Sequence, residues 1–416
     1  MNITYLRRRV IGALAITSVT FATVLTAGPT AASAAPAGAA TTTTTAVPAP
    51  PTTLGPTYYI RSLVSGWDHT CALRGDGTVA CWGGANQGQL GTGTLTAQSS
   101  AVTLPNLRRV SELAAGAQTT CALTWDREVY CWGRNDHGQV GDGTGARRTT
   151  PVKVPISGAT LLAVGNSHAC ATTDSALYCW GANESGQLGT NDTVDRLSPT
   201  VVGVGVPFVA LGAFNSSTCG QTSFGHTACT GSNLGMFGNG SVNGSKSFTT
   251  VPALTANYDR TVIDGATHRC HAERESGKVR CVGSNGNGGL GDGTNLTRTS
   301  VVTPPGVFST ATAGFTNLSC GFEKVLRQYQ CWGSNGQGQV GDGTTTNRAT
   351  PVPVKGLPAI NQTYGSVSAG RYHACATYDP GAYSPDRVYC WGSDSSEQLG
   401  NGTGGSSTTA VLVKGV

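Results

Sequence analysis

Short apolar segments alternate with Gly-rich polar stretches along most of the chain, from about Tyr58 to Val416. Each unit opens with an apolar alternation that ends in Ala-Gly, as at residues 113–116 and 367–370. A short strand, a turn, a second strand, a Gly-rich turn and a final strand follow, so the pattern predicts four short strands per unit. No segment shows a persuasive helical spacing of apolar residues. The pattern therefore predicts an all-β fold.

The unit recurs seven times, and the first cysteines of successive units are 49 to 55 residues apart. Seven units of four short antiparallel strands predict a seven-bladed β-propeller, in which each blade covers its neighbours and few sheet edges stay exposed. A linear solenoid is the alternative, but no unit looks like a capping repeat. We therefore expect a closed propeller over residues 58–416.

The two cysteines of each unit lie 9 to 15 residues apart, on the two arms of one hairpin. Cysteines that face each other across antiparallel strands have the Cα separation that a disulfide needs. A zinc site is the alternative, but no C-x-x-C spacing occurs, and seven separated pairs cannot converge on one metal. We expect one disulfide within each blade: Cys71–Cys81, Cys121–Cys131, Cys170–Cys179, Cys219–Cys229, Cys270–Cys281, Cys320–Cys331 and Cys375–Cys390.

The residues before the repeats have the pattern of an exported protein. Residues 1–34 combine the three arginines Arg7 to Arg9, an apolar run and an A-x-A cleavage pattern, which predicts a secretory signal peptide. Residues 35–57 are rich in Pro, Thr and Ala and predict a disordered linker. Export and an even number of cysteines together predict a secreted, extracellular protein.

The small net charge predicts neither a nucleic-acid partner nor a basic membrane patch. The formal net charge is +5, and the signal arginines supply three of these charges. We therefore expect no nucleic-acid partner and no basic membrane patch. The apolar run near the start is short and diluted by polar residues, so we expect no membrane span, and we expect a monomer.

Side chains with catalytic or metal-binding potential stand in positions that favour structural roles. Four units carry a histidine two residues before the first cysteine: His69, His168, His268 and His373. One histidine per blade would lie far from the next, so we expect each to hydrogen bond to the backbone of a neighbouring blade. The Gly-Asp-Gly-Thr stretches at 141–144, 291–294 and 341–344 hold one acid each and predict turns rather than calcium sites. With no nucleophile motif visible, we predict no catalytic, cofactor-binding or metal-binding residues and no cofactor.

Aromatic residues suggest two other roles. A Trp follows the second cysteine in five units and is expected to pack between blades: Trp82, Trp132, Trp180, Trp332 and Trp391. Variable aromatics near the turn after Ala-Gly are the binding candidates: Trp67, Phe214, Phe315 and Tyr372. These four could instead cover the strand ends. The hairpin tips on the opposite face form a second, less favoured set: Trp125, Phe224, Phe322 and Tyr383.

Residues 84–94 (GANQGQLGTGT) and 369–376 (AGRYHACA) resemble the two halves of the regulator of chromosome condensation repeat. The resemblance recurs in all seven units and implies a seven-bladed propeller. Eukaryotic members include a nuclear nucleotide-exchange factor, a partner class that an exported chain does not meet. Secreted bacterial members include the β-lactamase inhibitor protein II, and this chain is similar to it in export, repeat number and size.

This resemblance implies an extracellular protein-binding propeller without catalysis, an inhibitor of a secreted or cell-wall enzyme. Shape and aromatic burial would carry the affinity, since the net charge is small. Two alternatives remain open. One is a propeller that binds a glycan, such as a polysaccharide or peptidoglycan, through the same aromatics, and the other is an enzyme with its site at the channel mouth.

Overall fold

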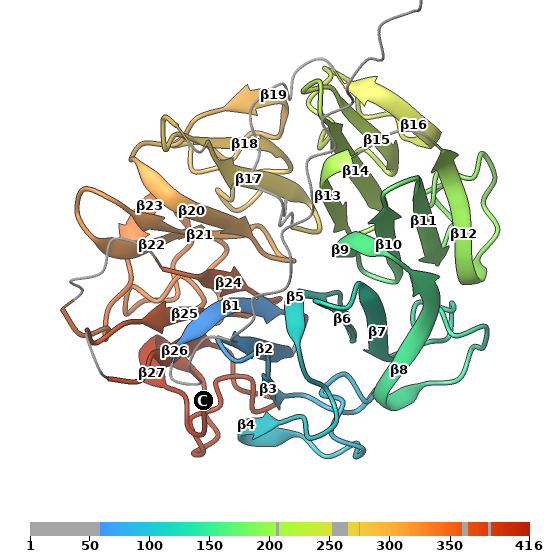
Figure 1. Cartoon of the computed structure of the whole chain (residues 1–416). Helices are drawn as coiled ribbons and strands as arrows, with labels where there is room; N and C mark the ends of the chain where they lie inside the picture. Colours follow the sequence, from blue (N-terminus) through green and yellow to red (C-terminus); the bar gives the residue numbers. More distant parts are fainter. Residues whose placement is uncertain (1–58, 205–207, 252–264, 274, 360–364, 382–383) are drawn as a thin grey trace, which may run out of the picture. The chain divides into compact units, whose positions relative to one another are not determined.

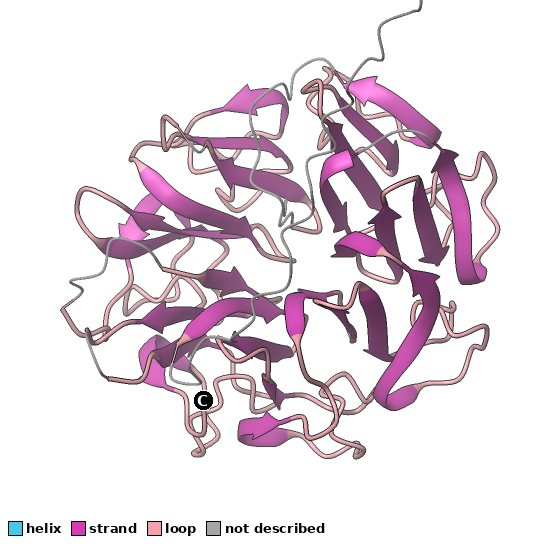
Figure 2. Ribbon diagram, in the orientation of Figure 1, coloured by secondary structure: helices cyan, strands magenta, loops and turns pink. Residues whose placement is uncertain are grey.

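The structure is a computed structural model that describes residues 59–204, 208–251, 265–273, 275–359, 365–381 and 384–416. The predicted signal peptide and linker lie outside the described residues. The described residues contain 27 strands and no helix. Figure 2 shows these strands joined by turns and loops. The predicted all-β fold is confirmed.

The strands form seven antiparallel sheets around a central axis, so the seven-bladed propeller is confirmed (Figure 1). Each blade follows the chain outward from an inner strand. Blade 1 contains β1 (Ile60–Ser65), β2 (His69–Arg74), β3 (Val79–Gly83) and β4 (Gln98–Thr103). Blade 2 contains β5 (Val110–Ala115), β6 (Thr119–Thr124), β7 (Glu128–Gly133) and β8 (Arg148–Ser157). Blade 3 contains β9 (Ala159–Val164), β10 (His168–Thr173), β11 (Ala176–Gly181) and β12 (Arg196–Val204).

The remaining blades repeat this order. Blade 4 contains β13 (Phe208–Phe214), β14 (Ser217–Thr222), β15 (Thr227–Gly231) and β16 (Ser245–Val251). Blade 5 has three strands among the described residues, β17 (His268–Ala272), β18 (Val279–Gly283) and β19 (Arg298–Val302). Blade 6 contains β20 (Phe308–Ala313), β21 (Leu318–Glu323), β22 (Gln328–Gly333) and β23 (Arg348–Pro353). Blade 7 contains β24 (Val367–Ala369), β25 (His373–Tyr378), β26 (Arg387–Gly392) and β27 (Ser407–Leu412).

Each predicted disulfide joins the second and third strands of its own blade, and no cysteine is free. The paired cysteines stand directly opposite each other in the strand register, as Cys170 and Cys179 do. Their Cα atoms are 4.0 to 4.2 Å apart, near the spacing of a non-hydrogen-bonded pair across antiparallel strands. The one-disulfide-per-blade prediction is therefore confirmed.

The repeated tryptophans join neighbouring blades, as predicted. All five are fully buried. The indole N–H of Trp132 donates to the carbonyl of Gln89 in the preceding blade at 2.9 Å, and Trp82, Trp180, Trp332 and Trp391 make the equivalent bond. In blade 4, where Trp is absent, the Thr230 hydroxyl donates to Gly186 O at 2.8 Å. The carbonyl that matches the indole's partner in other blades, Gln187 O, accepts from the Thr218 hydroxyl at 2.8 Å, so it stays satisfied although the aromatic packing is lost.

The Gly-Asp-Gly-Thr stretches form turns, as their sequence predicts. In the first of them, Asp142 accepts from the backbone N–H of Thr144 at 3.1 Å and from its hydroxyl at 2.9 Å. The other carboxylate oxygen of Asp142 is paired with Arg148. Because the turn and the ion pair engage both carboxylate oxygens, the aspartate fixes the loop conformation.

Among the described residues, no strand is exchanged between the two ends of the propeller. β27 pairs with β26 of its own blade. The junction between blades 7 and 1 is held by side chains and by the last residues of the chain: Ile60 N donates to the Asp386 carboxylate at 2.8 Å, and Ala101 N donates to Lys414 O at 2.8 Å. Val413 lies in a buried apolar cluster with residues of both blades. Figure 1 places the C-terminus beside blade 1.

Candidate functional site

The two ends of the propeller differ in the loops that they carry. The turns between the first and second strands of each blade lie at the same end as the Gly-rich loops between the third and fourth strands. We call this end the loop face. The turns between the second and third strands form the opposite end, which we call the hairpin face. Trp67, Phe315 and Tyr372 belong to turns of the loop face.

Backbone hydrogen bonds link the turns of the loop face from blade to blade. Trp67 N donates to Ala117 O at 2.9 Å, and Asn166 N donates to Asn215 O at 3.0 Å. Arg371 N donates to Trp67 O at 3.3 Å, which carries the series across the junction of blades 7 and 1. These bonds fix the turns relative to one another around the channel mouth.

A set of glycines allows this close approach. We call it the glycine collar, and it comprises Gly66, Gly116, Gly165, Gly265, Gly314 and Gly370. A Cβ atom on Gly116 would lie against Gly165 O, well inside van der Waals contact, and one on Gly370 would lie 2.7 Å from Gly66 O. At five of the six positions a Cβ would meet a backbone oxygen of the next blade and push neighbouring turns apart, and at Gly165 it would meet the His168 ring. The collar therefore explains the Ala-Gly ending of the sequence pattern.

Trp67 and Tyr372 come together on the loop face, from blades 1 and 7. The guanidinium carbon of Arg371 lies 4.7 Å from the centroid of the Trp67 ring and 4.9 Å from that of Tyr372. All three side chains are half-buried. Cation–π contacts of this kind favour one arrangement of the three groups. We call this group the Trp67–Arg371–Tyr372 stack.

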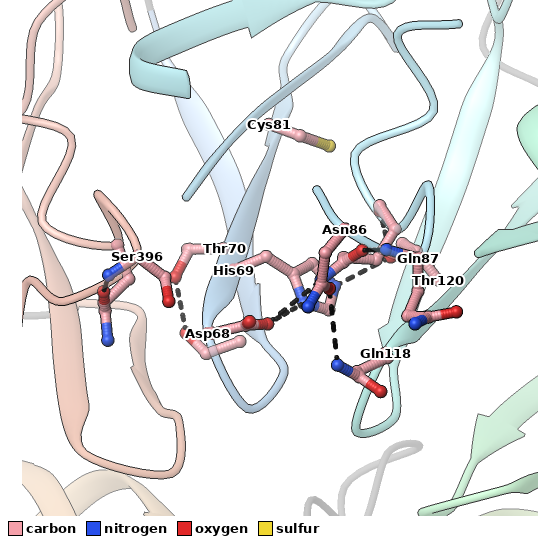
Figure 3. Close-up of polar contacts among 12 residues, drawn as sticks. Asp68, His69, Thr70, Cys81, Asn86, Gln87, Gln118, Thr120 and Ser396 are labelled. Atoms are coloured by element: carbon pink, nitrogen blue, oxygen red, sulfur yellow. Dashed lines mark hydrogen bonds and ion pairs between the residues drawn. The ribbon is translucent and has the colours of Figure 1, made fainter. Parts of the chain in front are cut away.

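The acidic side chain of Asp68 adds a negative charge next to the stack. Asp68 accepts from the Gln89 side-chain amide at 3.1 Å. Burial raises the pKa of Asp68, although the Gln89 hydrogen bond and the charge of Arg371 act in the opposite direction. Figure 3 shows Asp68 beside His69 and the loop residues Asn86 and Gln87. The stack thus presents aromatic surface with charges of both signs.

The other two binding candidates occupy different environments. Phe315 is half-buried in the turn of blade 6, where its N–H donates to Gly370 O at 3.2 Å. The prediction that Phe214 is exposed for binding is wrong. Phe214 stands at the position that the collar glycine occupies in other blades, and its side chain is 1% exposed between blades 4 and 5. The Arg269 guanidinium lies 5.1 Å from its ring centroid, so Phe214 fills a blade interface.

A cavity of about 400 Å³ lies along the inner strands of the propeller. Phe315 borders its loop-face end, and Arg61 and Trp125 border its hairpin-face end. The ionisable side chains of its described wall are Arg61, Glu112 and Arg127, and most of the remaining wall is Ala, Ser, Leu and Val. Of these three groups, Arg127 is paired with Asp174 at 2.7 Å.

The four repeated histidines are buried between blades. Burial lowers the pKa of His69 and His373 to about 3 and that of His168 and His268 to about 4, so all four are neutral near pH 7. The predicted backbone partner needs correction, because His69 Nε2 bonds to the hydroxyl of Thr120 in the next blade at 2.9 Å (Figure 3). That hydroxyl in turn donates to Gln89 O at 2.9 Å. The histidine thus reaches the backbone through one intervening side chain.

The aromatic residues of the second set, predicted for the hairpin face, differ in how exposed they are. Phe224 is 84% exposed, whereas Trp125 is half-buried under the Arg61 guanidinium. Phe322 is fully buried and packs edge-to-face on Tyr329 with ring centroids 5.0 Å apart, so its expected exposure at a tip is wrong. Tyr383 lies outside the described residues.

Two further features concern metals and membranes. Among the described residues, no group of three or more His, Cys, Asp or Glu side chains is placed to hold a metal ion. Within the same parts of the chain, no helix is long and apolar enough to cross a membrane.

Two models of the regulator of chromosome condensation (RCC1) repeat match the sequence. One matches residues 60–89, 110–139 and 160–187, and the other matches residues 76–123, 126–172, 174–223 and 331–377. Together the matches run from residue 60 to 223 and from 331 to 377, which is half of the chain. The chain belongs to the RCC1-repeat family. No curated protein matches this RCC1-repeat chain in sequence.

Solved RCC1-type structures share the fold of this RCC1-repeat propeller. Yeast RCC1 (Prp20), solved in complex with Kap60, is 18% identical with a TM-score of 0.68, and the match covers 86% of each chain. Human WBSCR16 is 21% identical with a TM-score of 0.62, and the match covers 76% of this chain and 86% of that one. At these identities the likeness shows the fold.

Sequence reasoning missed Arg371, the central residue of the stack in this RCC1-repeat propeller. The signal was present, because Arg371 directly follows a collar glycine, as Trp67, Ala117 and Asn166 do in other blades. In blade 7 the turn that carries Arg371 lies next to the turn that carries Trp67 only if the propeller closes between blades 7 and 1. The pairing therefore depends on ring closure.

Proposed function

We propose that the protein is an extracellular binding module that holds a partner protein on its loop face, with the Trp67–Arg371–Tyr372 stack at the centre of contact. The target class that we propose is a secreted or cell-wall enzyme, whose active site the loop face would cover. The stack carries this proposal, because Trp, Tyr and Arg dominate the binding energy of protein interfaces. The similarity to the secreted bacterial inhibitor stays a prediction.

The rigidity of the loop face supports binding. The turns that carry Trp67 and Arg371 are joined by a backbone hydrogen bond, and a disulfide stands in each adjoining hairpin. Little conformational freedom is then lost on association, so more of the interaction energy appears as affinity. Asp68 and Arg371 carry opposite charges, so shape and aromatic burial would outweigh long-range steering.

The geometry of the stack favours a protein partner over a glycan. A sugar ring would need the open face of an aromatic side chain, whereas the Arg371 guanidinium covers one face of both Trp67 and Tyr372. Guanidinium edges and indole rims suit the backbone carbonyls and carboxylates of a protein surface. Glycan binding is therefore the weaker of the two proposals.

The experiment compares single variants in capture of proteins from the culture supernatant of the producing cells. Wild-type chain should retain one protein in stoichiometric amount, and Trp67→Ala and Arg371→Ala should each weaken its affinity at least tenfold by calorimetry. Phe224→Ser, at the opposite face, serves as the matched aromatic control and should bind like wild type. Unchanged affinity in both loop-face variants, or retention of polysaccharide instead of protein, contradicts the proposal.

A further inference from the structure

The hairpin face is divided into two unlike halves. At blades 2 and 3 the charged tip residues pair with one another, as Arg109 does with Asp126 at 3.0 Å and Arg127 with Asp174 at 2.7 Å. At blades 4 and 6 the tips carry bulky apolar side chains in their place. Phe224 is 84% exposed, Val325 is 73% exposed and Leu326 is 63% exposed. These are the most exposed large apolar side chains of the hairpin face among the described residues.

The apolar tip of blade 6 is held in a fixed outward conformation. Glu323 is 4% exposed, and its carboxylate accepts from the backbone N–H of Leu326 and, at 3.2 Å, from that of Val307. Lys324 N donates to Val307 O at 2.7 Å, and Arg327 adopts a left-handed backbone with φ of 51°. The buried acid thus ties the turn to the chain that enters the blade. Val325 and Leu326 are therefore held at the surface.

Basic side chains surround this tip. Lys324 and Arg327 flank the two apolar residues, and Lys278 stands on the neighbouring tip of blade 5, which is joined to blade 6 by the bond from Phe308 N to Gly277 O at 2.7 Å. No ion pair of the described residues engages these three cations.

The acids on the same two tips leave a net positive charge. Glu273 is paired with Arg280 at 2.7 Å, Glu323 is buried, and Glu275 is the exposed acid. Among the described residues of the tips of blades 5 and 6, three cations without an ion pair therefore stand beside one exposed carboxylate.

We propose that the tips of blades 4 to 6 bind the surface of a lipid bilayer that contains anionic headgroups. Phe224, Val325 and Leu326 would enter the boundary between headgroups and acyl chains, and the three cations would contact the phosphates. Apolar insertion and attraction to anionic lipid are the two terms that hold peripheral proteins on membranes. Separate protruding tips suit a deformable lipid surface, whereas a protein hot spot is a packed, half-buried cluster like the stack on the loop face.

Co-sedimentation of the purified full chain with vesicles tests this proposal. Vesicles of mixed phosphatidylglycerol and phosphatidylcholine should bind the wild type, and vesicles of phosphatidylcholine alone should bind it at least tenfold less. The double variant Val325→Ser/Leu326→Ser should lower the partition coefficient for mixed vesicles at least tenfold. Lys324→Gln/Arg327→Gln should abolish the preference for anionic lipid. The control is Leu296→Ser, because Leu296 is also 63% exposed but lies in a loop of the opposite face.

The outcomes separate lipid from other occupants. Thermal unfolding of each variant at the wild-type temperature shows that the exposed substitutions leave the fold intact. Wild-type chain that stays in the supernatant with mixed vesicles overturns the proposal, and so does equal partition of wild type and the Val325→Ser/Leu326→Ser variant. A dimer that this variant dissolves, in a chain that does not bind vesicles, would assign the tips to a second copy and would also overturn it. None of these results bears on the loop face.

Discussion

At the scale of single residues, substitutions should be least tolerated where neighbouring blades meet. Five of the six collar glycines lie against the backbone of the next blade, and the buried histidines bond to its hydroxyl groups. Both contacts need a defined atom at a defined distance. In a close-packed protein interior, the addition of even one carbon atom forces the surrounding atoms to move.

A collar glycine should therefore not accept a methyl group. In Gly116→Ala the new Cβ would lie against Gly165 O, so the blades must separate or the turn must distort. We expect the free energy of unfolding to fall by about 2 kcal/mol or more, measured by urea denaturation. Gly286→Ala is the control, because nothing lies within 4 Å of a Cβ there. Equal loss in both variants would argue against the collar.

The buried histidines predict the pH dependence of stability. Their pKa values fall from an ordinary value near 6.5 to about 3 or 4 because burial disfavours the charged form. As the pH falls from about 6.5 to about 4, the unfolded chain binds protons that the folded chain does not, so stability decreases. Thermal unfolding across that range should show a smaller slope in His168→Gln, while exposed His226→Gln should keep the wild-type slope. A slope that is unchanged in both variants contradicts this account.

At the scale of elements, the stapled hairpin is the repeating unit of the fold. Each disulfide joins directly opposed residues of the second and third strands, so the covalent bond and the strand register reinforce each other. A change in register would move the two cysteines apart. The disulfides therefore help to fix the pairing of each hairpin.

Removal of one disulfide should destabilise the protein without changing its fold. The loop closed by Cys170–Cys179 has a sequence separation of 9, for which the chain-entropy model gives about 2–3 kcal/mol of stability. We expect Cys170→Ala/Cys179→Ala to lose about that much in guanidinium unfolding while keeping its far-ultraviolet circular dichroism. A variant as stable as wild type would show that the reduced hairpin is already ordered in the unfolded chain.

The elements could be predicted from the sequence because the cysteine pairs, Ala-Gly endings and Gly-rich turns repeat within short stretches. The burial of individual aromatics could not. Phe214 and Phe322 look alike in sequence to exposed turn residues, yet each is buried by contacts with residues such as Arg269 and Tyr329. Trp67 and Tyr372 of the stack were predicted from the sequence, but Arg371 was not. Trp67 and Arg371 are about 300 residues apart in the chain and meet only because the propeller closes.

At the scale of the whole molecule, the two faces are suited to different surfaces. The loop face presents a packed, half-buried stack beside a rigid channel mouth, and the hairpin face presents protruding apolar tips with unpaired cations. If both proposals hold, the propeller would stand on a membrane by one face and present its binding site on the other. The closed circle of blades keeps the two faces a fixed distance apart.

The last residues of the chain help to close that circle, since no strand of the described residues is exchanged between the ends. Val413 is buried in the cluster that joins blades 7 and 1, Lys414 O accepts from Ala101 N, and Gly415 O accepts from Arg74 at 3.1 Å. Deletion of residues 413–416 removes one buried aliphatic side chain and four hydrogen bonds, because Val413 N also donates to Val388 O and Lys414 N to Gly400 O. We therefore expect the free energy of unfolding to fall by about 3 kcal/mol or more.

The loss should also be local to the junction. Hydrogen exchange of the deletion variant should accelerate in β1 and β24, which line the junction, while β9 and β10 of blade 3 keep their protection until global unfolding. Lys414→Ala retains the backbone carbonyl and should match wild type in both measurements. Uniform acceleration in all blades would mean that the propeller opens as one cooperative unit, and unchanged exchange at β1 would mean that side-chain packing such as Trp82 on Gln398 closes the circle alone.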